Sequence, residues 1–307
     1  MGRNTRNDGK GAAPRRKEDL IRHYYPKNDE MLLSFLISVL KDKSRTTIKS
    51  LLAHKQVAIN GRAVTQFDTP VHPTDEVSIN FSRAFNFFKH PMMRIVYEDP
   101  DLIVVDKAAG LLSMGTDTIK EKTAYRILSE YVKRHDMRNR IFIVHRLDRD
   151  TSGLMLFAKN PKVQTKLQAD WDQAVLERRY VAVVEGTPEK EKGELRSYLA
   201  ENSAMNVYST TPDKGKLAIT QFFVRKTKGR YTLVDLELLT GRKNQIRVHM
   251  QEFGHPVAGD KKYGAKTNPM RRMMLHAAKL RFVHPITKEN LVFETSLPAK
   301  FKMIMGM

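Results

Sequence analysis

Strand-forming runs that follow one another without a helix between them are the feature that most limits the fold of this 307-residue chain. Arg94–Tyr97 and Leu102–Asp106 are two short apolar runs around the turn sequence EDPD. Leu217–Arg225 and Arg230–Thr240 form another such pair around Lys226–Gly229. A doubly wound fold needs a helix after every strand, whereas strands joined by tight turns pair antiparallel. We therefore predict an α+β fold with a mixed, largely antiparallel central sheet and flanking helices.

Helical periodicity occurs at irregular places between these strands. Thr123–Arg134 carries apolar residues at helical spacing, and Asn160-Pro161 is a typical start for a helix that we expect to reach about Val175. The only tryptophan, Trp171, is predicted to lie on that helix and in the core. The next strand is expected at Arg179–Gly186, and a further helix at Asn244–Phe253, ended by Gly254.

Composition changes along the chain predict four parts. Residues 1–17 hold six basic residues and no apolar pattern, which is typical of a disordered basic arm. Residues 18–82 form a small module with two short helices and a hairpin at Asn60-Gly61. Residues 83–93 are an aromatic-rich linker, and residues 94–307 are the larger domain.

Charge and composition narrow the class of function. The chain has 54 Lys and Arg against 34 Asp and Glu, a formal net charge of +20, which favours a polyanionic partner, most often nucleic acid and next an anionic membrane surface. It has no cysteine, which excludes disulfides, thiolate metal sites and cysteine nucleophiles. No apolar run is long enough to cross a bilayer, and the N-terminus lacks a signal-peptide centre, so we expect a cytoplasmic protein that binds no membrane. The histidines lack the spacing of a metal helix, so we predict no metal and no cofactor.

The segment from His145 to Gly153 carries the strongest chemical signal. It places two carboxylates, two guanidiniums and two hydroxyls between two apolar strands, where catalytic loops are common. A carboxylate that acts as a nucleophile needs a cationic neighbour to keep it ionised, and Arg146 is such a neighbour for Asp148. The residues alone leave open an alternative, a surface turn held by Asp–Arg pairs.

This segment resembles the signature of the RluA-type pseudouridine synthases, which isomerise uridine in structured RNA. Further motifs of that family are matched in order as far as the C-terminus, by Glu177–Ala182, Thr240–His249, Gly259–Gly264 and Leu275–Pro285. Asn244 stands where the third motif commonly has His. The small module resembles an S4 RNA-binding domain, because Ser44-Arg45 opens its second helix and Val57-Ala58-Ile59-Asn60-Gly61 matches the signature turn.

The resemblance implies a role for each matched residue. Asp148 is the catalytic carboxylate, Arg247 its ion-pair partner, and Tyr180 the residue that stacks on the target base. Ile246 gives the pocket an apolar wall, while Arg146 and Arg242 contact the substrate. In the S4-like module, the residues expected to contact RNA are Arg45, Lys49, Lys55 and Arg62. The implied fold is that of the pseudouridine synthases.

We therefore predict an RNA pseudouridine synthase that acts as a monomer, with large-subunit ribosomal RNA as its substrate. Three alternatives stay open: a synthase directed at transfer RNA, an RNA-binding factor without catalysis, and a glycosidase acting on nucleosides. The last usually needs a second carboxylate opposite Asp148.

Overall fold

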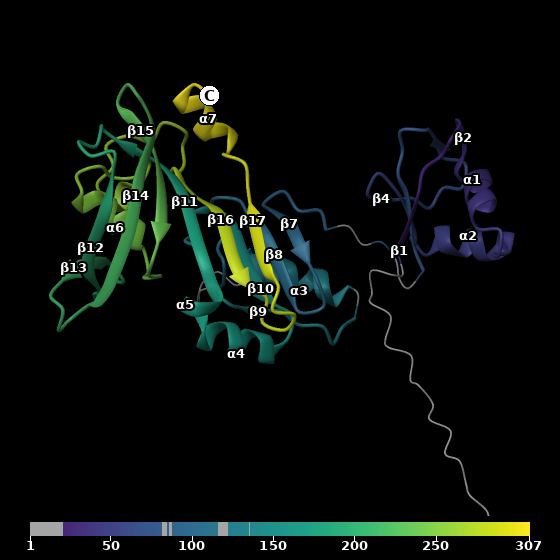
Figure 1. Ribbon diagram of the computed structural model, residues 1–307, viewed down its shortest axis with the longest axis horizontal. Coiled ribbons are helices and arrows are strands. Elements are labelled where there is room, and N and C mark those ends of the chain that lie inside the picture. Colours follow the sequence, from purple (N-terminus) through teal and green to yellow (C-terminus); the bar gives the residue numbers. More distant parts are fainter. Residues whose placement is uncertain (1–20, 82–84, 86–87, 116–121, 135) are drawn as a thin grey trace, which may run out of the picture. The chain divides into compact units, whose positions relative to one another are not determined.

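The computed structural model describes residues 21–81, 85, 88–115, 122–134 and 136–307, and it divides the chain into two compact units, residues 1–88 and 89–307 (Figure 1). The predicted basic arm, 1–17, lies outside the described residues, as do several positions of the predicted linker, 83–93. Among the described residues, no helix is long and apolar enough to cross a membrane.

The described residues of the smaller unit form two short helices and two small antiparallel sheets. The four-stranded sheet has the order β1-β6-β3-β4, and β2 pairs with β5. The bounds are β1 Ile21–Tyr24, β2 Glu30–Met31, α1 Leu32–Val39, α2 Arg45–Ala53, β3 Val57–Ile59, β4 Arg62–Ala63, β5 Pro70–Val71 and β6 Val77–Asn80.

Local sequence explains the start of α2 and the hairpin that follows it. The Ser44 hydroxyl accepts a hydrogen bond from the Thr47 amide at 3.1 Å, which caps the first turn of α2. Asn60 and Gly61 both have positive φ, 47° and 73°, as the predicted two-residue hairpin turn requires. The apolar faces of both helices pack on the sheet, so the unit has its own core.

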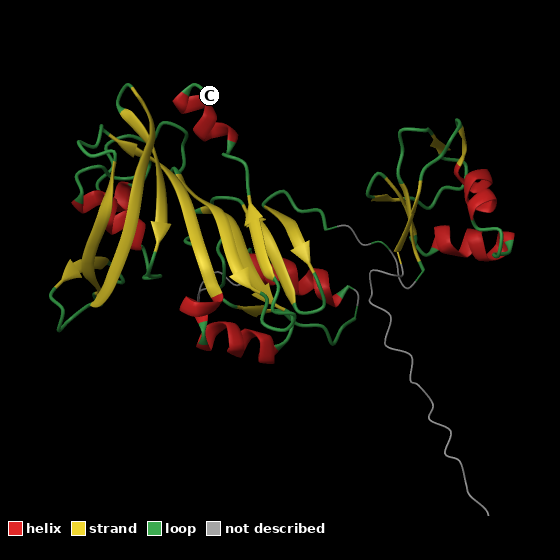
Figure 2. Cartoon of the chain, in the orientation of Figure 1, coloured by secondary structure: helices red, strands yellow, loops and turns green. Residues whose placement is uncertain are grey.

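The described residues of the larger unit form one eleven-stranded sheet, ordered β13-β12-β14-β15-β11-β16-β10-β8-β7, with β17 beside β16 and β9 beside β10 (Figure 2). Every pair is antiparallel except β10 with β16, which confirms the predicted mixed, largely antiparallel α+β fold. The strands are β7 Met93–Glu98, β8 Leu102–Lys107, β9 Phe142–Ile143, β10 Ser152–Ala158, β11 Val175–Glu185, β12 Lys192–Glu201, β13 Val207–Thr210, β14 Lys216–Lys228, β15 Tyr231–Leu238, β16 Leu275–Val283 and β17 Asn290–Glu294.

Helices flank this sheet. Those described are α3 Ala124–Lys133, α4 Pro161–Ala169, α5 Trp171–Ala174, α6 Gln245–Glu252, α7 Ala299–Met305 and the 3₁₀ turn η2 Lys261–Tyr263. The prediction of one continuous helix from Asn160 to about Val175 is wrong at Asp170, where α4 ends before the short helix α5. The helix breaks at Asp170, and Val175 already begins β11, because pairing with Phe282 of β16 buries this β-branched residue.

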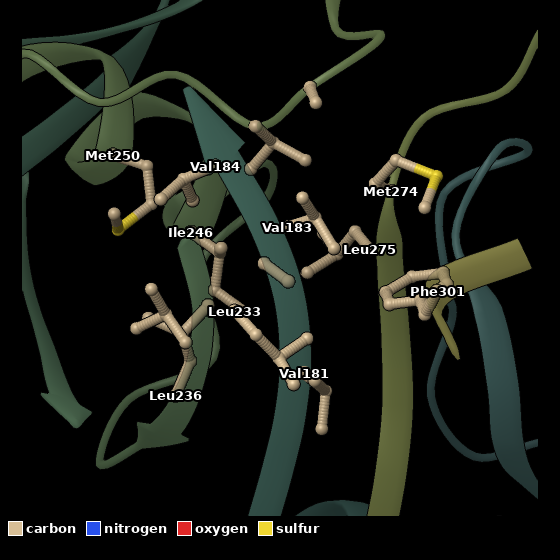
Figure 3. Close-up of a cluster of buried hydrophobic side chains, with 14 of the residues drawn as sticks. Val181, Val183, Val184, Leu233, Leu236, Ile246, Met250, Met274, Leu275 and Phe301 are labelled. Atoms are coloured by element: carbon tan, nitrogen blue, oxygen red, sulfur yellow. The ribbon is translucent and has the colours of Figure 1, made fainter. Parts of the chain in front are cut away.

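The main core surrounds β11 and fixes α6. Figure 3 shows β11 passing between Ile246 and Met250 of α6 on one side and Phe301 of α7 on the other. These side chains belong to one buried cluster with Val181 and Val183. Because Ile246 anchors α6 in this cluster, the neighbouring position 247 is held at a fixed place beside the sheet.

The parallel contact between β10 and β16 leaves no room for a side chain at Gly153. Its φ is +115°, and a Cβ there would lie 2.1 Å from the carbonyl oxygen of Ala277. Gly153 is therefore required at the start of the strand that follows the 144–151 loop.

Replacing Gly153 by Ala is expected to lower the free energy of unfolding by more than about 3 kcal/mol, because both the backbone conformation and the space exclude a methyl group. The control is Gly229→Ala, which also has positive φ, +57°, but open space around its Cβ position. That variant should lose only about 1 kcal/mol. Urea unfolding measures both, and equal losses would contradict the steric explanation.

Candidate active site

A cleft of about 580 Å³ opens in the larger unit. It is lined by the loop between β9 and β10, by β11, by the start of α6, and by two methionines, Met114 and Met205. All six residues predicted for catalysis and substrate binding line it: Arg146, Asp148, Tyr180, Arg242, Ile246 and Arg247. They come from segments up to about a hundred residues apart in sequence.

The loop that carries Asp148 is held by backbone hydrogen bonds on both sides of that residue. The Ser113 hydroxyl donates to the Leu147 carbonyl at 2.6 Å and accepts from the Leu147 amide at 3.1 Å. The Gly110 amide donates to the Arg149 carbonyl at 2.8 Å. Asp148 therefore sits between two fixed backbone positions.

Lys107 binds the same loop through hydrogen bonds from its side-chain ammonium. Its side chain is fully buried, and its ammonium donates to the carbonyls of Ala108, Leu111, Arg149 and Thr151 at 2.7 to 3.2 Å. Burial lowers the pKa of Lys107 to about 8, against the opposing charges of the nearby aspartates, so the group stays protonated at neutral pH. The sequence reasoning missed this residue, because a lysine at the end of an apolar strand is typical of a strand end that reaches solvent.

Arg247 makes two hydrogen bonds to Asp260 and one to Asp148. Its Nε and Nη2 donate to the two carboxylate oxygens of Asp260 at 2.6 and 2.9 Å, and its Nη1 donates to Oδ2 of Asp148 at 2.9 Å. The Asp260 side chain is 2% exposed, whereas that of Asp148 is 31% exposed. Asp260 thus orients the guanidinium, and Asp148 is the partner that faces the cleft.

Asp260 and Asp148 stabilise the charged form of Arg247. Burial alone disfavours the charged guanidinium, but hydrogen bonding and charge from Asp260, followed by Asp148, outweigh that effect and raise the pKa of Arg247 above its ordinary value. Sequence reasoning matched Asp260 to a turn motif but gave it no role, because nothing in the sequence tells which cation it would meet.

Asn244 completes the surroundings of Arg247. Its Oδ1 accepts from Nη1 of Arg247 at 3.1 Å, and its Nδ2 donates to the Tyr263 hydroxyl at 2.9 Å. The ring of Tyr263 lies 4.7 Å from the guanidinium carbon of Arg247. Asn244 has φ of +53°, a left-handed conformation that asparagine tolerates well. The amide therefore makes polar contacts at the position where the related motif commonly has His.

Tyr180 and Arg178 line the cleft from β11. Burial raises the pKa of Tyr180 to about 12; the charge of Arg178 opposes this shift and that of Asp148 adds to it. The Tyr180 hydroxyl is therefore neutral at physiological pH and keeps its proton as a hydrogen-bond donor.

Basic residues dominate the described lining of the cleft. They are Arg146, Arg149, Arg178, Arg242, Lys243 and Arg247, whereas Asp148 is the single carboxylate among the lining residues. Arg242 is anchored through its Nε to the Leu217 carbonyl at 2.9 Å. Asp150, two residues after Asp148, pairs instead with its exposed neighbour Arg149 at 3.2 Å. This charge distribution favours a polyanionic ligand.

Trp171 differs from its predicted place in the core. It packs partly against a buried cluster, but it also lines the cleft, with its ring 5.0 Å from that of His145. Burial lowers the pKa of His145 to about 3, and its Nε2 accepts from the Leu156 amide at 3.0 Å. A neutral His145 thus ties the loop to β10.

The residues predicted to bind RNA in the smaller unit lie on α2 and in the segment that follows it. Arg45 and Lys49 lie on α2, Lys55 follows it with φ of +56°, and all three are exposed. The side chain of Arg62 lies outside the described part of the structure.

One group of possible metal ligands, Asp99, Asp101 and His284, lies within 4.8 Å among the described residues. Its atoms already serve the fold: His284 Nε2 and Asp99 Oδ2 are 3.0 Å apart, and Asp99 Oδ1 accepts from the amides of Asp101 and Leu102. The group closes the β7–β8 turn, and we assign no metal to it.

Comparisons with known proteins agree on one family. The model described as RNA pseudouridylate synthase matches residues 101–252. An uncharacterized RNA pseudouridine synthase of Bacillus subtilis, YhcT, is 32% identical over 90% of this chain and 93% of its own. The ribosomal large subunit pseudouridine synthase D of Pasteurella multocida is 31% identical over 87% of each chain. The structure of human RNA pseudouridylate synthase domain containing 4 covers 67% of this chain and 89% of its own, with a TM-score of 0.56 and 22% identity.

Replacing Lys107 by Met is expected to destabilise the larger unit by about 3 kcal/mol or more, because four carbonyls around a fully buried position would each lose the ammonium as a donor. Lys162→Met, at an exposed position of α4, serves as the control and should change stability by less than about 0.5 kcal/mol. Thermal and urea unfolding measure both. Equal stabilities would show that the loop does not depend on Lys107.

Proposed function

Because this chain belongs to the RNA pseudouridylate synthase family, we propose that it isomerises uridines in large-subunit ribosomal RNA, with Asp148 as the catalytic carboxylate. The observation that carries the proposal is an accessible carboxylate held by a buried Arg247–Asp260 pair in a cationic cleft. The choice of RNA is supported by the relative named for the ribosomal large subunit.

The reaction is an isomerisation that needs no external reactant. The N1–C1′ bond breaks, the uracil turns, and a C5–C1′ bond forms; the proton on C5 is lost and N1 gains one. Asp148 can take part by attacking C1′, by attacking C6 of the base, or by removing a sugar proton. Each route requires a carboxylate that reaches the substrate, and Nη1 of Arg247 provides a cationic partner 2.9 Å from Oδ2 of Asp148.

The other cleft residues are proposed to hold the base and the backbone. Tyr180 stacks on the uracil and offers a neutral hydroxyl, which its raised pKa supports. Ile246, which is 4% exposed, provides an apolar wall that retains the detached base. Arg146 contacts a backbone phosphate or helps to hold the flipped nucleotide, and Arg242 contributes to substrate binding; both line the cleft.

A glycosidase is the chemical alternative, because the first bond broken is glycosidic. Such an enzyme usually places a second carboxylate across the substrate. Among the described lining residues there is none besides Asp148, and both oxygens of Asp260 are bound by Arg247. This argues for isomerisation.

The smaller unit is proposed to be an S4-like RNA-binding module that adds affinity through phosphate contacts by Arg45, Lys49, Lys55 and Arg62. Three exposed cations on one helix and the turn after it support this role. We propose that a single copy of the chain suffices, because all six residues assigned to catalysis and substrate binding meet in one cleft.

Replacing Asp148 by Asn should lower tritium release from C5-labelled ribosomal RNA by more than about a thousandfold, because the amide cannot act as nucleophile or base. Asp213→Asn is the matched control, since Asp213 is exposed and does not line the cleft, and it should stay within about threefold of wild type.

Three outcomes separate the alternatives. Release of free uracil would indicate a glycosidase. Tritium release from transfer RNA but not from ribosomal RNA would identify transfer RNA as the substrate. Absence of release from both RNA classes would contradict the proposed function.

Replacing Arg45, Lys49 and Lys55 together by Ala should weaken RNA binding and reduce the slope of log affinity against log salt by about two units. A triple replacement of exposed lysines in the larger unit, at Lys190, Lys192 and Lys214, is the control and should leave the slope unchanged. Filter binding over a salt series measures both, and equal slopes for the first variant and wild type would exclude phosphate contacts by these residues.

A further inference from the structure

Phe67 is an exposed aromatic side chain beside two cations of the smaller unit. It lies on the segment between β4 and β5 and is 50% exposed. The Nζ atom of Lys49, on α2, is 5.5 Å from the centre of the Phe67 ring. Arg45 lies one turn earlier on the same face of α2, because residues four apart in a helix are neighbours. These three side chains form one surface, which we call the Phe67 patch.

The ring of Phe67 is not part of the core of its unit. Among the described residues, the aromatic side chains that pack against that buried cluster include Tyr24 and Phe81, but not Phe67. A single exposed aromatic residue is common on protein surfaces, so exposure alone assigns no role to it. The backbone contacts and the neighbouring charges of Phe67 are more specific.

The backbone of Phe67 is held in place by the start of α1. This helix has no side-chain cap, and carbonyls of the Phe67 segment bind its first amides instead. The Leu32 amide donates to the Thr69 carbonyl at 2.8 Å, and the Leu33 amide donates to the Phe67 carbonyl at 3.0 Å. The Thr69 hydroxyl donates to the Gln66 carbonyl at 3.1 Å, which closes the segment. Because Leu32 and Leu33 are buried, these bonds tie Phe67 to the core.

The two cations of the patch have no anionic partner within the described part of the chain. No carboxylate there lies within ion-pairing distance of Arg45 or Lys49, and both side chains are exposed. Like charges four residues apart on a helix repel each other and destabilise it. A phosphate bound between Arg45 and Lys49 would relieve this repulsion.

A ring beside two cations matches the two parts of a nucleotide. An aromatic ring can stack on any base, and lysine and arginine can bind the phosphates. In a paired RNA helix, each base is covered on both faces by its neighbours, so a side chain can stack only on a base that is unpaired. An RNA helix can therefore engage the cations of the patch alone, whereas an unpaired nucleotide can engage the ring as well.

We propose that Phe67 stacks on an unpaired base of the RNA while Lys49 and Arg45 bind the adjoining phosphates. The smaller unit then selects RNA at a loop, a bulge or an end over a continuous helix. The inference rests on the proposed function, since it assumes that the smaller unit binds RNA. It adds a preference for unpaired nucleotides, which phosphate contacts alone do not provide.

The test measures binding of the full chain to two RNAs of equal length, about twelve nucleotides, by fluorescence anisotropy over a salt series. One is a single-stranded oligocytidylate, and the other is a duplex of G–C pairs. Neither contains uridine. Phe67→Ala should weaken binding to the oligocytidylate by about 10-fold or more and binding to the duplex by less than about twofold. Its slope of log affinity against log salt should equal that of wild type, because no charge is removed.

Three further variants separate stacking from other roles. Phe67→Trp keeps an aromatic ring and should bind as wild type, whereas Phe67→Leu keeps only an apolar side chain and should bind the oligocytidylate as weakly as Phe67→Ala. The matched control is Tyr25→Ala. Tyr25 is a 63% exposed aromatic residue of the same unit, but its hydroxyl donates to the Glu76 carboxylate at 3.3 Å, a group that repels phosphates. This control should bind both RNAs as wild type.

Equal weakening of binding to both RNAs, or rescue by Phe67→Leu, would show that Phe67 shapes the surface rather than stacking on a base. Unchanged binding by Phe67→Ala would exclude the contact. Each of these results overturns the inference alone. An unchanged salt slope after replacement of Arg45, Lys49 and Lys55 would instead overturn the proposed RNA-binding role of the smaller unit, and the inference with it.

Discussion

The pairing of Arg247 with the buried Asp260 determines the direction from which a guanidinium meets Asp148, the proposed catalytic carboxylate. Asp260 is almost inaccessible and holds two nitrogens of the guanidinium, so the third can only point toward the cleft, where it meets Asp148. An arginine held by a single, half-exposed aspartate would move with it, and the charge it offers would be screened by water. Because the second aspartate is buried, the interaction with Asp148 has a fixed direction, and the carboxylate keeps an exposed side for the substrate.

The two partners of this interaction are brought together by different parts of the same sheet. Asp148 lies on a loop whose backbone is fixed by Ser113, Gly110 and the buried ammonium of Lys107. Arg247 lies on α6, which is anchored in the core around β11 through Ile246. Both arrangements are made by side chains and backbone groups of the chain itself, so the fold holds the site in place. Preorganisation of this kind keeps the cost of reorganisation out of the reaction step.

Much of the fold could be predicted from the sequence, because turns and helix starts are specified by residues that are close together in the chain. Hairpin turns predicted the antiparallel sheet, and Ser44 and Asn160 marked the helix starts that the structure shows. Arg247 was expected beside Asp148 only through the resemblance, and the two side chains do meet. Lys107 and Asp260 could not be predicted, because their roles depend on carbonyls and cations that only folding brings near. The place of Val175 in β11 was missed because its pairing with a distant strand is not visible in the local periodicity.

The most direct test of this account measures single-turnover isomerisation rates for Arg247→Lys, Asp260→Asn and the double variant, with RNA affinity and thermal unfolding measured in parallel. Lysine cannot contact both aspartates at once, and asparagine removes the charge that orients the guanidinium. The account predicts that each single variant reacts about 100-fold more slowly, that the double variant is no slower than the slower single one, and that RNA affinity changes by less than about threefold. A folded Asp260→Asn variant with the wild-type rate, or losses that multiply in the double variant, would contradict it.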